Sequence, residues 1–174
     1  MRLGQVAARF VPAPVVTLIY WAKFRCFISP RAEVEVSGNL RIGPGTEIGS
    51  FTKIKASAGP LEIGPHVQIG TNCFIASGAA PSSIGRDCLI SPHVVILATN
   101  YRYDRLDVPI RKQGQTSKGI RIGDNVWIGA GAVILDGAVI GDGVMIAPNS
   151  VVSSRVRPNT IVQGNPAKVI FERR

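Results

Sequence analysis

Histidine, cysteine and aromatic residues are scarce in this chain of 174 residues. Two histidines are too few for a zinc site with three histidine ligands, as in carbonic anhydrases of the γ class, so we expect no metal site. Three cysteines without disulfide-like spacing predict buried free thiols and favour a reducing cytoplasm. The aromatic content of 6% suits a core of small aliphatic side chains.

Acidic residues are also few, since the chain has 11 Asp and Glu residues and 20 Lys and Arg residues, which gives a net charge of +9. This excess favours a polyanionic partner, such as the phosphates of a cofactor or a membrane surface. No helix-turn-helix, zinc-finger or aromatic RNA-binding motif is present, so we expect no nucleic-acid partner. The basic residues cluster in two stretches, Arg102, Arg105, Arg111, Lys112 and Lys118, and Arg155, Arg157, Lys168, Arg173 and Arg174. Solubilising surface charge is the alternative explanation for each of them.

Aliphatic residues recur at every sixth position along most of the chain. They are Ile42, Ile48, Ile54, Ile63, Ile69, Ile75, Ile84, Ile90, Ile96, Ile122, Ile128, Ile134, Ile140, Ile146 and Val152. Neither a helix with 3.6 residues per turn nor an alternating strand explains this period, but a triangular parallel β-helix does, with one inward aliphatic on each face. The fourth residue after most of these aliphatics is small or β-branched, as expected for a crowded corner.

Three interruptions of the repeat divide the chain. The intervals from Ile54 to Ile63, from Ile75 to Ile84 and from Ile96 to Ile122 exceed six residues and fall at the same corner of the triangle. The third interval carries a long loop, 97–119, of a length that is usually functional or disordered. We therefore expect a segment 1–27, a β-helix over 28–157 and a tail at 158–174.

The first 27 residues do not follow the six-residue aliphatic pattern of the repeat. The apolar stretch 15–22 is shorter than the roughly 20 residues that cross a bilayer, and no A-x-A-like cleavage site follows it. One interpretation is a cap over the open end of the coil, which would otherwise expose strand edges. The other is an interfacial segment that uses Tyr20, Trp21 and nearby basic residues against an anionic membrane.

The segment from Ile122 to Ile170, with its NVWIG and GNPAK elements, resembles the C-terminal half of hexapeptide-repeat acyltransferases. It is most similar to the sugar O-acetyltransferase branch, which includes maltose, galactoside, O-antigen and capsule acetyltransferases. The resemblance implies an all-β, left-handed parallel β-helix that assembles as a homotrimer, with acetyl-coenzyme A between neighbouring coils. The period itself does not determine the handedness.

The resemblance also assigns a cofactor site. Trp127 would lie beside the reaction centre, although packing at a subunit contact would also explain it. The backbone of Gly129, Ala130 and Gly131 would line the pantetheine channel. Lys168 and neighbouring arginines would meet the nucleotide phosphates, because phosphates bind cations in charge-assisted hydrogen bonds.

The chemistry implied by the resemblance is direct transfer to a sugar hydroxyl, with a histidine as general base and backbone N–H groups holding the oxyanion. Tyr101 stands where the family has that histidine, and tyrosine side chains ionise near pH 10, so a phenol is a poor base at neutral pH. The surrounding positions that resemble the family are Asn100, Asp104, Pro109 and Ile110. A second departure is Ala76, where galactoside-type enzymes carry an acceptor-binding asparagine.

Three accounts of the missing histidine stay open: the basic loop activates Tyr101, Asp104 or a neighbouring subunit's histidine replaces it, or the chain binds ligand and barely turns over. Of the two histidines, we expect His93 on another side of the triangle and His66 near the corner of the loop. For both, the simpler expectation is an exposed corner residue.

The sequence thus predicts an acetyl-CoA-dependent O-acetyltransferase acting on a saccharide or sugar-containing acceptor in surface polysaccharide biosynthesis. Its candidate catalytic residues are Asn100, Tyr101 and Asp104. The alternative is a non-catalytic trimeric binding or scaffold protein on the same coil. A cytoplasmic protein is expected in both cases, with membrane contact through residues 1–27 as a further option.

Overall fold

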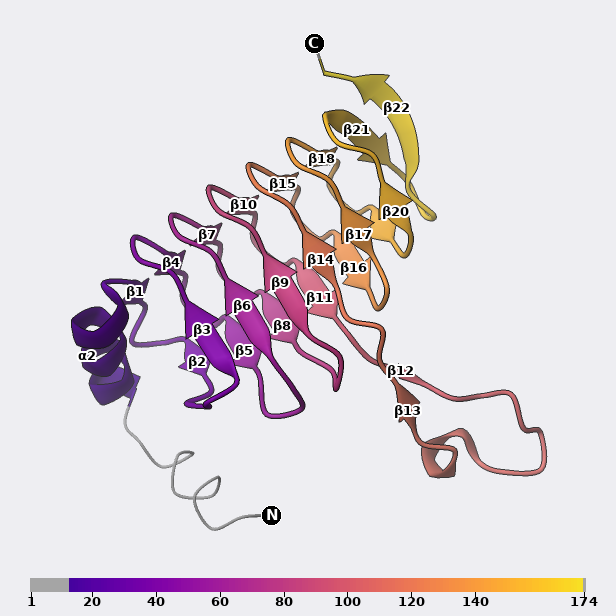
Figure 1. The fold of residues 1–174 in the computed structure, drawn as a ribbon, viewed down its shortest axis with the longest axis horizontal. Helices are drawn as coiled ribbons and strands as arrows, with labels where there is room; N and C mark the ends of the chain where they lie inside the picture. The colour runs from indigo at the N-terminus through magenta and orange to yellow at the C-terminus, as the bar shows by residue number, and fades with distance from the viewer. Residues whose placement is uncertain (1–12, 174) are drawn as a thin grey trace.

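Short strands repeat along the chain and stack into three parallel sheets, the three faces of a triangular β-helix (Figure 1). This computed structural model describes residues 13–173. We name the three sheets A, B and C, in the order in which the chain enters them. Sheets B and C contain six strands each, one per turn, and sheet A contains eight. In order along the stack, sheet A is formed by β1 (Phe27–Ile28), β4 (Glu47–Ile48), β7 (Gln68–Ile69), β10 (Leu89–Ile90), β15 (Trp127–Ile128), β18 (Met145–Ile146), β21 (Thr160–Gln163) and β22 (Lys168–Glu172).

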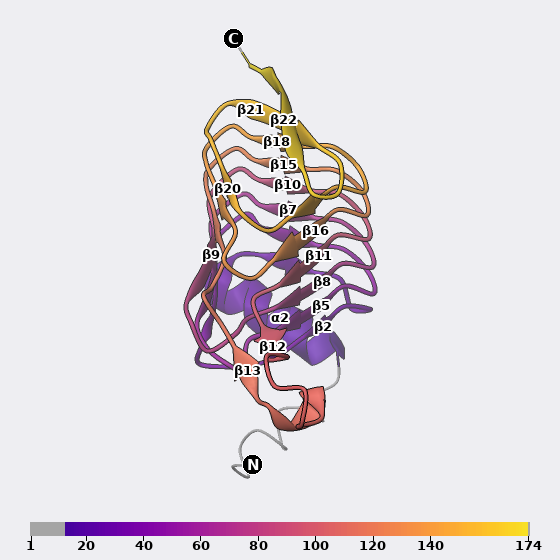
Figure 2. The same ribbon diagram turned by 90° about the vertical axis from the view of Figure 1, so that its right-hand side faces the viewer.

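The other two sheets follow the same order along the axis, and Figure 2 shows the strands of sheet B lying one above the next. Sheet B is formed by β2 (Glu33–Val34), β5 (Lys53–Lys55), β8 (Phe74–Ala76), β11 (Val95–Leu97), β16 (Val133–Leu135) and β19 (Val151–Val152). Sheet C is formed by β3 (Leu40–Ile42), β6 (Leu61–Ile63), β9 (Ser82–Ile84), β14 (Arg121–Ile122), β17 (Val139–Ile140) and β20 (Arg155–Val156).

The six-residue period arises because each face contributes one inward aliphatic, and the strand register aligns these residues from turn to turn. In sheet A, for example, Ile90 pairs with Ile69 on one side and Ile128 on the other. The aliphatics of the repeat are buried, as are the small residues predicted for the corners, including Thr46, Val67 and Ala132. The predicted fold class, an all-β parallel β-helix of the hexapeptide-repeat kind, is confirmed.

The corners differ in length, and we name each by the two sheets that it joins. Corner AB consists of the four-residue turns 29–32, 49–52, 70–73, 91–94, 129–132 and 147–150, which connect sheet A to sheet B. Corner CA leads from sheet C back to sheet A. The longer connections all lie at corner BC, between β2 and β3, β5 and β6, β8 and β9, and β11 and β14.

The excursion loop, 97–119, leaves the coil at corner BC and projects from it (Figure 1). Its base is a two-stranded antiparallel ladder of β12 (Asn100–Tyr101) and β13 (Gln115–Thr116). A short 3-10 helix, η2 (Ile110–Lys112), lies in the returning half. The loop is therefore a paired excursion with its own internal structure.

Helix α2 (Ala13–Phe24) lies at the N-terminal end of the coil beside β1 (Figure 1). Two side chains tie it to the first turn, because Thr17 Oγ1 donates to the Ile28 carbonyl at 2.8 Å and Tyr20 Oη donates to the Glu35 carbonyl at 3.3 Å. Within residues 13–173, no helix has the length and apolar character needed to span a membrane. The first part of the expected segment 1–27, residues 1–12, lies outside the described residues.

The three cysteines, Cys26, Cys73 and Cys88, are buried and free, as predicted. Burial raises the pKa of each thiol, that of Cys88 to about 11. The Sγ atoms of Cys73 and Cys88 approach backbone carbonyls of neighbouring turns, such as the Gly123 oxygen at 3.2 Å from Cys88, and that of Cys26 approaches the Tyr20 carbonyl of α2 at 3.6 Å. They act as small corner residues of the core.

Candidate functional site

Trp127 stands on the outward face of sheet A, at the middle of the stack. Its neighbour Ile128 points inward, so the two-residue strand β15 leaves the indole in solvent with 43% of its surface exposed. The indole Nε1 donates a hydrogen bond to Ser91 Oγ of the preceding turn at 3.1 Å. This bond fixes the ring beside the start of corner AB.

The turn after Trp127 contains the three residues predicted to line a pantetheine channel, Gly129, Ala130 and Gly131. Two of its amides are already used by the coil, because Gly129 N–H donates to the Ile146 carbonyl at 2.8 Å and Gly131 N–H donates to the Pro92 carbonyl at 3.1 Å. Of the three amides, only that of the exposed Ala130 has no acceptor among the described residues. The backbone donors expected at this turn are thus reduced to one.

Close packing explains the glycines of this turn. A Cβ on Gly129 would lie 2.6 Å from the Pro148 nitrogen of the next turn, which is too close for any side chain. Gly131 has a φ of +70°, and the side-chain oxygen of Asn149 occupies the space above it. Glycine is therefore required here by the coil, whatever ligand lies against it.

Lys168 reaches the same corner from the end of the chain. The antiparallel pair β21 and β22 is closed by a turn over 164–167 that folds back on corner AB. There Val151 N–H donates to the Gly164 carbonyl at 2.9 Å, and Ala167 N–H donates to the Val151 carbonyl at 2.8 Å. Trp127, the turn 129–131 and Lys168, which the sequence predicts as one site, thus lie along corner AB and its flanks, with β18 between the strands β15 and β21.

Two of the arginines expected to assist Lys168 have other partners. Arg173 Nη1 donates to the Gly143 carbonyl at 2.6 Å, at corner CA. Arg157 forms an ion pair with Glu172 at 3.1 Å. Lys168 is exposed and has no ion pair among residues 13–173. Lys168 is therefore a cation at corner AB that is free to meet a phosphate, whereas Arg155, which also has no ion pair among residues 13–173, lies on sheet C.

The candidate catalytic residues Asn100, Tyr101 and Asp104 lie on the excursion loop, at corner BC. Asn100 pairs with Thr116 and Tyr101 pairs with Gln115 across the β12–β13 ladder. All three side chains are exposed. Figures 1 and 2 show the ladder projecting on the side of the coil away from β15. Within one chain, the predicted catalytic residues and the predicted cofactor residues therefore lie at different corners.

Side chains that the sequence analysis did not select hold this loop in place. The carboxylate of Asp136 accepts hydrogen bonds from the amides of Lys118, at 2.8 and 2.9 Å, and of Gly119, at 2.9 Å. Ser117 Oγ donates to the Ala98 carbonyl at 2.8 Å, which joins the two ends of the loop. The signal for Asp136 in the sequence is an acidic residue that directly follows the aliphatic stretch 132–135.

A second set of bonds stiffens the tip of the loop. Gln113 Nε2 donates to the carbonyls of Arg105 and Val108, both at 2.7 Å, and Gln113 Oε1 accepts from the Arg105 amide at 3.1 Å. Arg105 also forms an ion pair with Asp107 at 2.6 Å, and its guanidinium keeps the pKa of that exposed carboxyl below its ordinary value. The tip therefore presents its side chains from a defined backbone.

The two histidines lie at corners other than that of the loop. His93 is in corner AB, as expected for a different side of the triangle, with a φ of +63° and its amide bonded to the Thr71 carbonyl. His66 is in corner CA, so the expectation that it lies near the corner of the loop is wrong. The error arose from counting residues, because a separation of about two turns does not fix the corner when the excursion loop intervenes. Both histidines are exposed.

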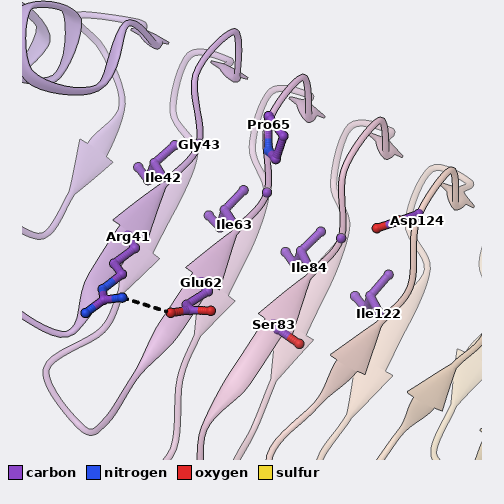
Figure 3. Close-up of a pocket in the computed structure, with 12 residues that line it drawn as sticks. Arg41, Ile42, Gly43, Glu62, Ile63, Pro65, Ser83, Ile84, Ile122 and Asp124 are labelled. Atoms are coloured by element: carbon purple, nitrogen blue, oxygen red, sulfur yellow. Dashed lines mark hydrogen bonds and ion pairs between the residues drawn. The ribbon is translucent and has the colours of Figure 1, made fainter.

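A separate groove of about 490 Å³ runs along sheet C and its edge with corner CA (Figure 3). Arg41 and Glu62 form an ion pair at 3.5 Å on its wall, and Asp124 lies at its other end. None of the residues predicted for the catalytic or cofactor site lines this groove. Within residues 13–173, no group of three His, Cys, Asp or Glu side chains could hold a metal ion.

Comparison with known proteins relates the chain to acyltransferases. The family profile of the bacterial transferase hexapeptide (six repeats) matches residues 119–154. A candidate acetyltransferase of Dictyostelium discoideum is 41% identical over 88 residues, 50% of this chain and 45% of that protein. Galactoside O-acetyltransferase of Escherichia coli K12 is 38% identical over 85 residues, 48% of this chain and 40% of that protein. The chain thus spans less than half the length of these curated relatives.

Solved structures match over nearly the whole chain. AntD, an N-acyltransferase from Bacillus cereus in complex with dTDP and 3-hydroxybutyryl-CoA, has a TM-score of 0.79 at 21% identity, covering 95% of this chain and 90% of its own. A hexapeptide-repeat-containing acetyltransferase from Vibrio cholerae, complexed with acetyl coenzyme A, has a TM-score of 0.66 at 24% identity, covering 98% and 83%. Residues 119–154 thus carry the hexapeptide repeat of bacterial transferases, and the chain has the fold of hexapeptide-repeat acyltransferases.

Proposed function

We propose that this chain transfers an acetyl group from acetyl-coenzyme A to a hydroxyl group of a saccharide or sugar-containing acceptor, as a step in surface polysaccharide biosynthesis. The observation that carries the proposal is the gathering of Trp127, the turn 129–131 and Lys168 along corner AB. An apolar ring, a tightly turned backbone and a free cation match the acyl arm and the phosphates of a coenzyme A thioester. Both structural neighbours were crystallised with a coenzyme A derivative.

We place the acyl donor along corner AB, with the thioester near Trp127 and the phosphates toward Lys168. The exposed Ala130 amide is then the backbone donor that would face the thioester or the pantetheine. The sugar acceptor is supported by the relationship to galactoside O-acetyltransferase and by the sugar nucleotide in AntD complexes.

The proposal includes a homotrimer, because the candidate catalytic loop and the candidate cofactor corner lie apart within one chain. A second copy would bring its excursion loop against corner AB of the first. The loop is suited to such packing, since it exposes large apolar side chains from its base to its tip: Tyr101, Tyr103, Leu106 and Ile110. Apolar side chains held on a defined backbone are typical of a surface that another subunit covers.

In the proposed reaction, the acceptor oxygen attacks the thioester carbonyl carbon, the C–S bond breaks and coenzyme A leaves as the thiolate. The hydroxyl proton passes to a base and finally to the departing sulfur. Tyr101 or Asp104 of the loop would take this proton, and Asn100 would orient the acceptor. Losing a histidine base costs roughly 10² to 10⁴ in rate, while proximity and oxyanion stabilisation continue to act.

A second candidate function is acyl transfer to an amino sugar. Tyr101 in place of histidine favours it, because an unprotonated amine attacks a thioester without first losing a proton to a base. AntD, an N-acyltransferase, was crystallised with dTDP-4-amino-4,6-dideoxyglucose and coenzyme A. Amino and hydroxyl acceptors must therefore be compared in one assay.

The decisive experiment measures coenzyme A release from acetyl-CoA with neutral sugars, sugar nucleotides and amino-sugar nucleotides. The native chain is compared with Tyr101→His and with Tyr103→His, a matched control at an exposed tyrosine of the same loop. If position 101 is the base position, Tyr101→His raises turnover with hydroxyl acceptors by 10-fold or more, and Tyr103→His leaves it unchanged.

Each other outcome has a defined meaning. If turnover is faster with amino-sugar acceptors alone, the proposed reaction would be N-acyl transfer in place of O-acyl transfer. No turnover in any variant, with coenzyme A still bound, would favour the non-catalytic trimeric scaffold. A monomer by analytical ultracentrifugation would contradict the shared site. A cytoplasmic location is part of the proposal, and the three free thiols support it.

A further inference from the structure

Helix α2 is apolar on both of its faces. Its inner face, with Tyr20 and Phe24, packs on the first turn of the coil. Its outer face carries Val15, Leu18, Ile19 and Ala22, at the i, i+3, i+4 and i+7 spacing of a single helical stripe. Leu18 is 64% exposed, and Val15 and Ile19 are 42% exposed.

Such a helix is unusual on a protein surface. A helix that packs one face on a core normally carries polar residues on the opposite face. Here the outer stripe contains none, and Trp21, also 64% exposed, lies beside it. A contiguous exposed patch of this kind marks an interaction surface.

The charges around the stripe indicate which partner covers it. No acidic residue occurs between positions 13 and 32, while Lys23, Arg25 and Arg31 are exposed there. None of these three has an ion pair among residues 13–173. The first acids of the chain are engaged elsewhere: Glu33 pairs with Lys53 at 2.8 Å, and the Glu35 carboxylate accepts from the amides of Ala56 and Ser57 at 2.9 Å.

We propose that the outer face of α2 binds the surface of an anionic lipid bilayer, with the helix lying in the plane of the interface. The apolar stripe would enter the acyl boundary, Trp21 would sit at headgroup level, and Lys23 and Arg25 would meet lipid phosphates. The helix is too short to cross a membrane, so it rests on one leaflet. This inference does not depend on the acyltransferase proposal, and it places the coil at the membrane whatever it binds.

The test is co-sedimentation of the full chain with vesicles of pure phosphatidylcholine and of phosphatidylcholine with about one-third phosphatidylserine. Binding is expected only to the anionic vesicles and is expected to fall steeply between 0.1 and 1 M salt, as the Debye length shrinks from about 10 to about 3 Å. In a Trp127→Phe background, Trp21 fluorescence should shift to the blue on binding. No binding to anionic vesicles would overturn the proposal.

Two double variants separate the apolar and charged contributions. Leu18→Gln with Trp21→Gln should weaken vesicle binding by about tenfold or more. Lys23→Gln with Arg25→Asn should weaken it roughly 30-fold; asparagine is chosen because Arg25 has a φ of +52°, which asparagine tolerates. The matched controls are Leu106→Gln, at a fully exposed loop leucine, and Arg41→Gln, on sheet C. Equal losses in the controls would contradict a site on α2.

Two alternatives to a membrane as the partner of the apolar stripe give distinct results in these experiments. If a second copy covers it, the Leu18→Gln, Trp21→Gln variant sediments as a smaller species in analytical ultracentrifugation, without vesicles. If residues 1–12 cover it, the intact chain does not bind and only a chain lacking them binds vesicles. Either result would overturn the membrane assignment, and circular dichroism confirms that each variant is folded.

Discussion

The indole N–H of Trp127 is bonded to the hydroxyl of Ser91, one turn earlier in the coil, at 3.1 Å. The bond joins the outward face of sheet A to the first residue of the turn 91–94 in corner AB. It holds the ring at one end of the turns that we assign to the acyl donor. Ser91 therefore positions the ring without being part of the aliphatic repeat.

Replacing Trp127 tests this assignment directly. Trp127→Ala should weaken coenzyme A binding about 10-fold, because it removes an apolar wall of the groove, and Ser91→Ala should weaken it only about 2- to 3-fold, because the ring stays but is less fixed. Isothermal titration calorimetry with coenzyme A measures both. The control is Phe27→Ala, an exposed aromatic residue on the same sheet at the N-terminal end of the stack. Similar weakening by Phe27→Ala would show that the effect is not local.

Asp136 should anchor the excursion loop. Asp136→Ala leaves the amides of Lys118 and Gly119 without their carboxylate, and we expect a loss of about 2–4 kcal/mol in the free energy of unfolding. Protease cleavage within 97–119 should also become faster. Asp142→Ala is the control, since that exposed carboxylate accepts from one amide, of Asp124 at 2.8 Å. Equal effects of the two substitutions would argue against a special role of Asp136.

The core of the fold was predictable because its signal is local and repeated. The period of six identifies each inward aliphatic, such as Ile90, as the core residue of one face. The long intervals identify the corner at which the chain leaves the coil. The small corner residues were predictable for the same reason, since the side-chain space is the same in every turn.

The site was predictable only in part, because its residues come from different corners. The resemblance selected Trp127 and Lys168, which lie along the same corner of the coil, but the bonds that occupy Arg157 and Arg173 depend on the folded tail. His66 was placed at the wrong corner because a residue count does not carry the register across a loop. Asp136 was missed because its partners lie 17 and 18 residues away in sequence.

Gly129 should tolerate no side chain. An alanine Cβ would lie 2.6 Å from the Pro148 nitrogen and 2.8 Å from the Ile146 oxygen, so the turn must shift, and overpacking of this kind costs about 1–3 kcal/mol. Urea unfolding of Gly129→Ala measures the loss. Gly38→Ala is the control, because a Cβ there meets no atom within 4 Å. If Gly129→Ala were as stable as Gly38→Ala, the neighbouring turns would not be packed as described.

Stability should decline in alkaline solution because the N-terminal helix and the coil bury ionisable groups in their neutral forms. Desolvation raises the pKa of Tyr20 from 10.0 to about 12 and that of the Cys88 thiol from 9.0 to about 11. The unfolded chain loses these protons first, so their stabilising contribution is complete below about pH 9 and is lost between pH 9 and 12. Thermal unfolding from pH 8 to 11 should show a falling midpoint. Tyr20→Phe should flatten the decline above pH 10, and Cys88→Ala should flatten it from pH 9. An unchanged slope in both variants would assign the decline to other groups.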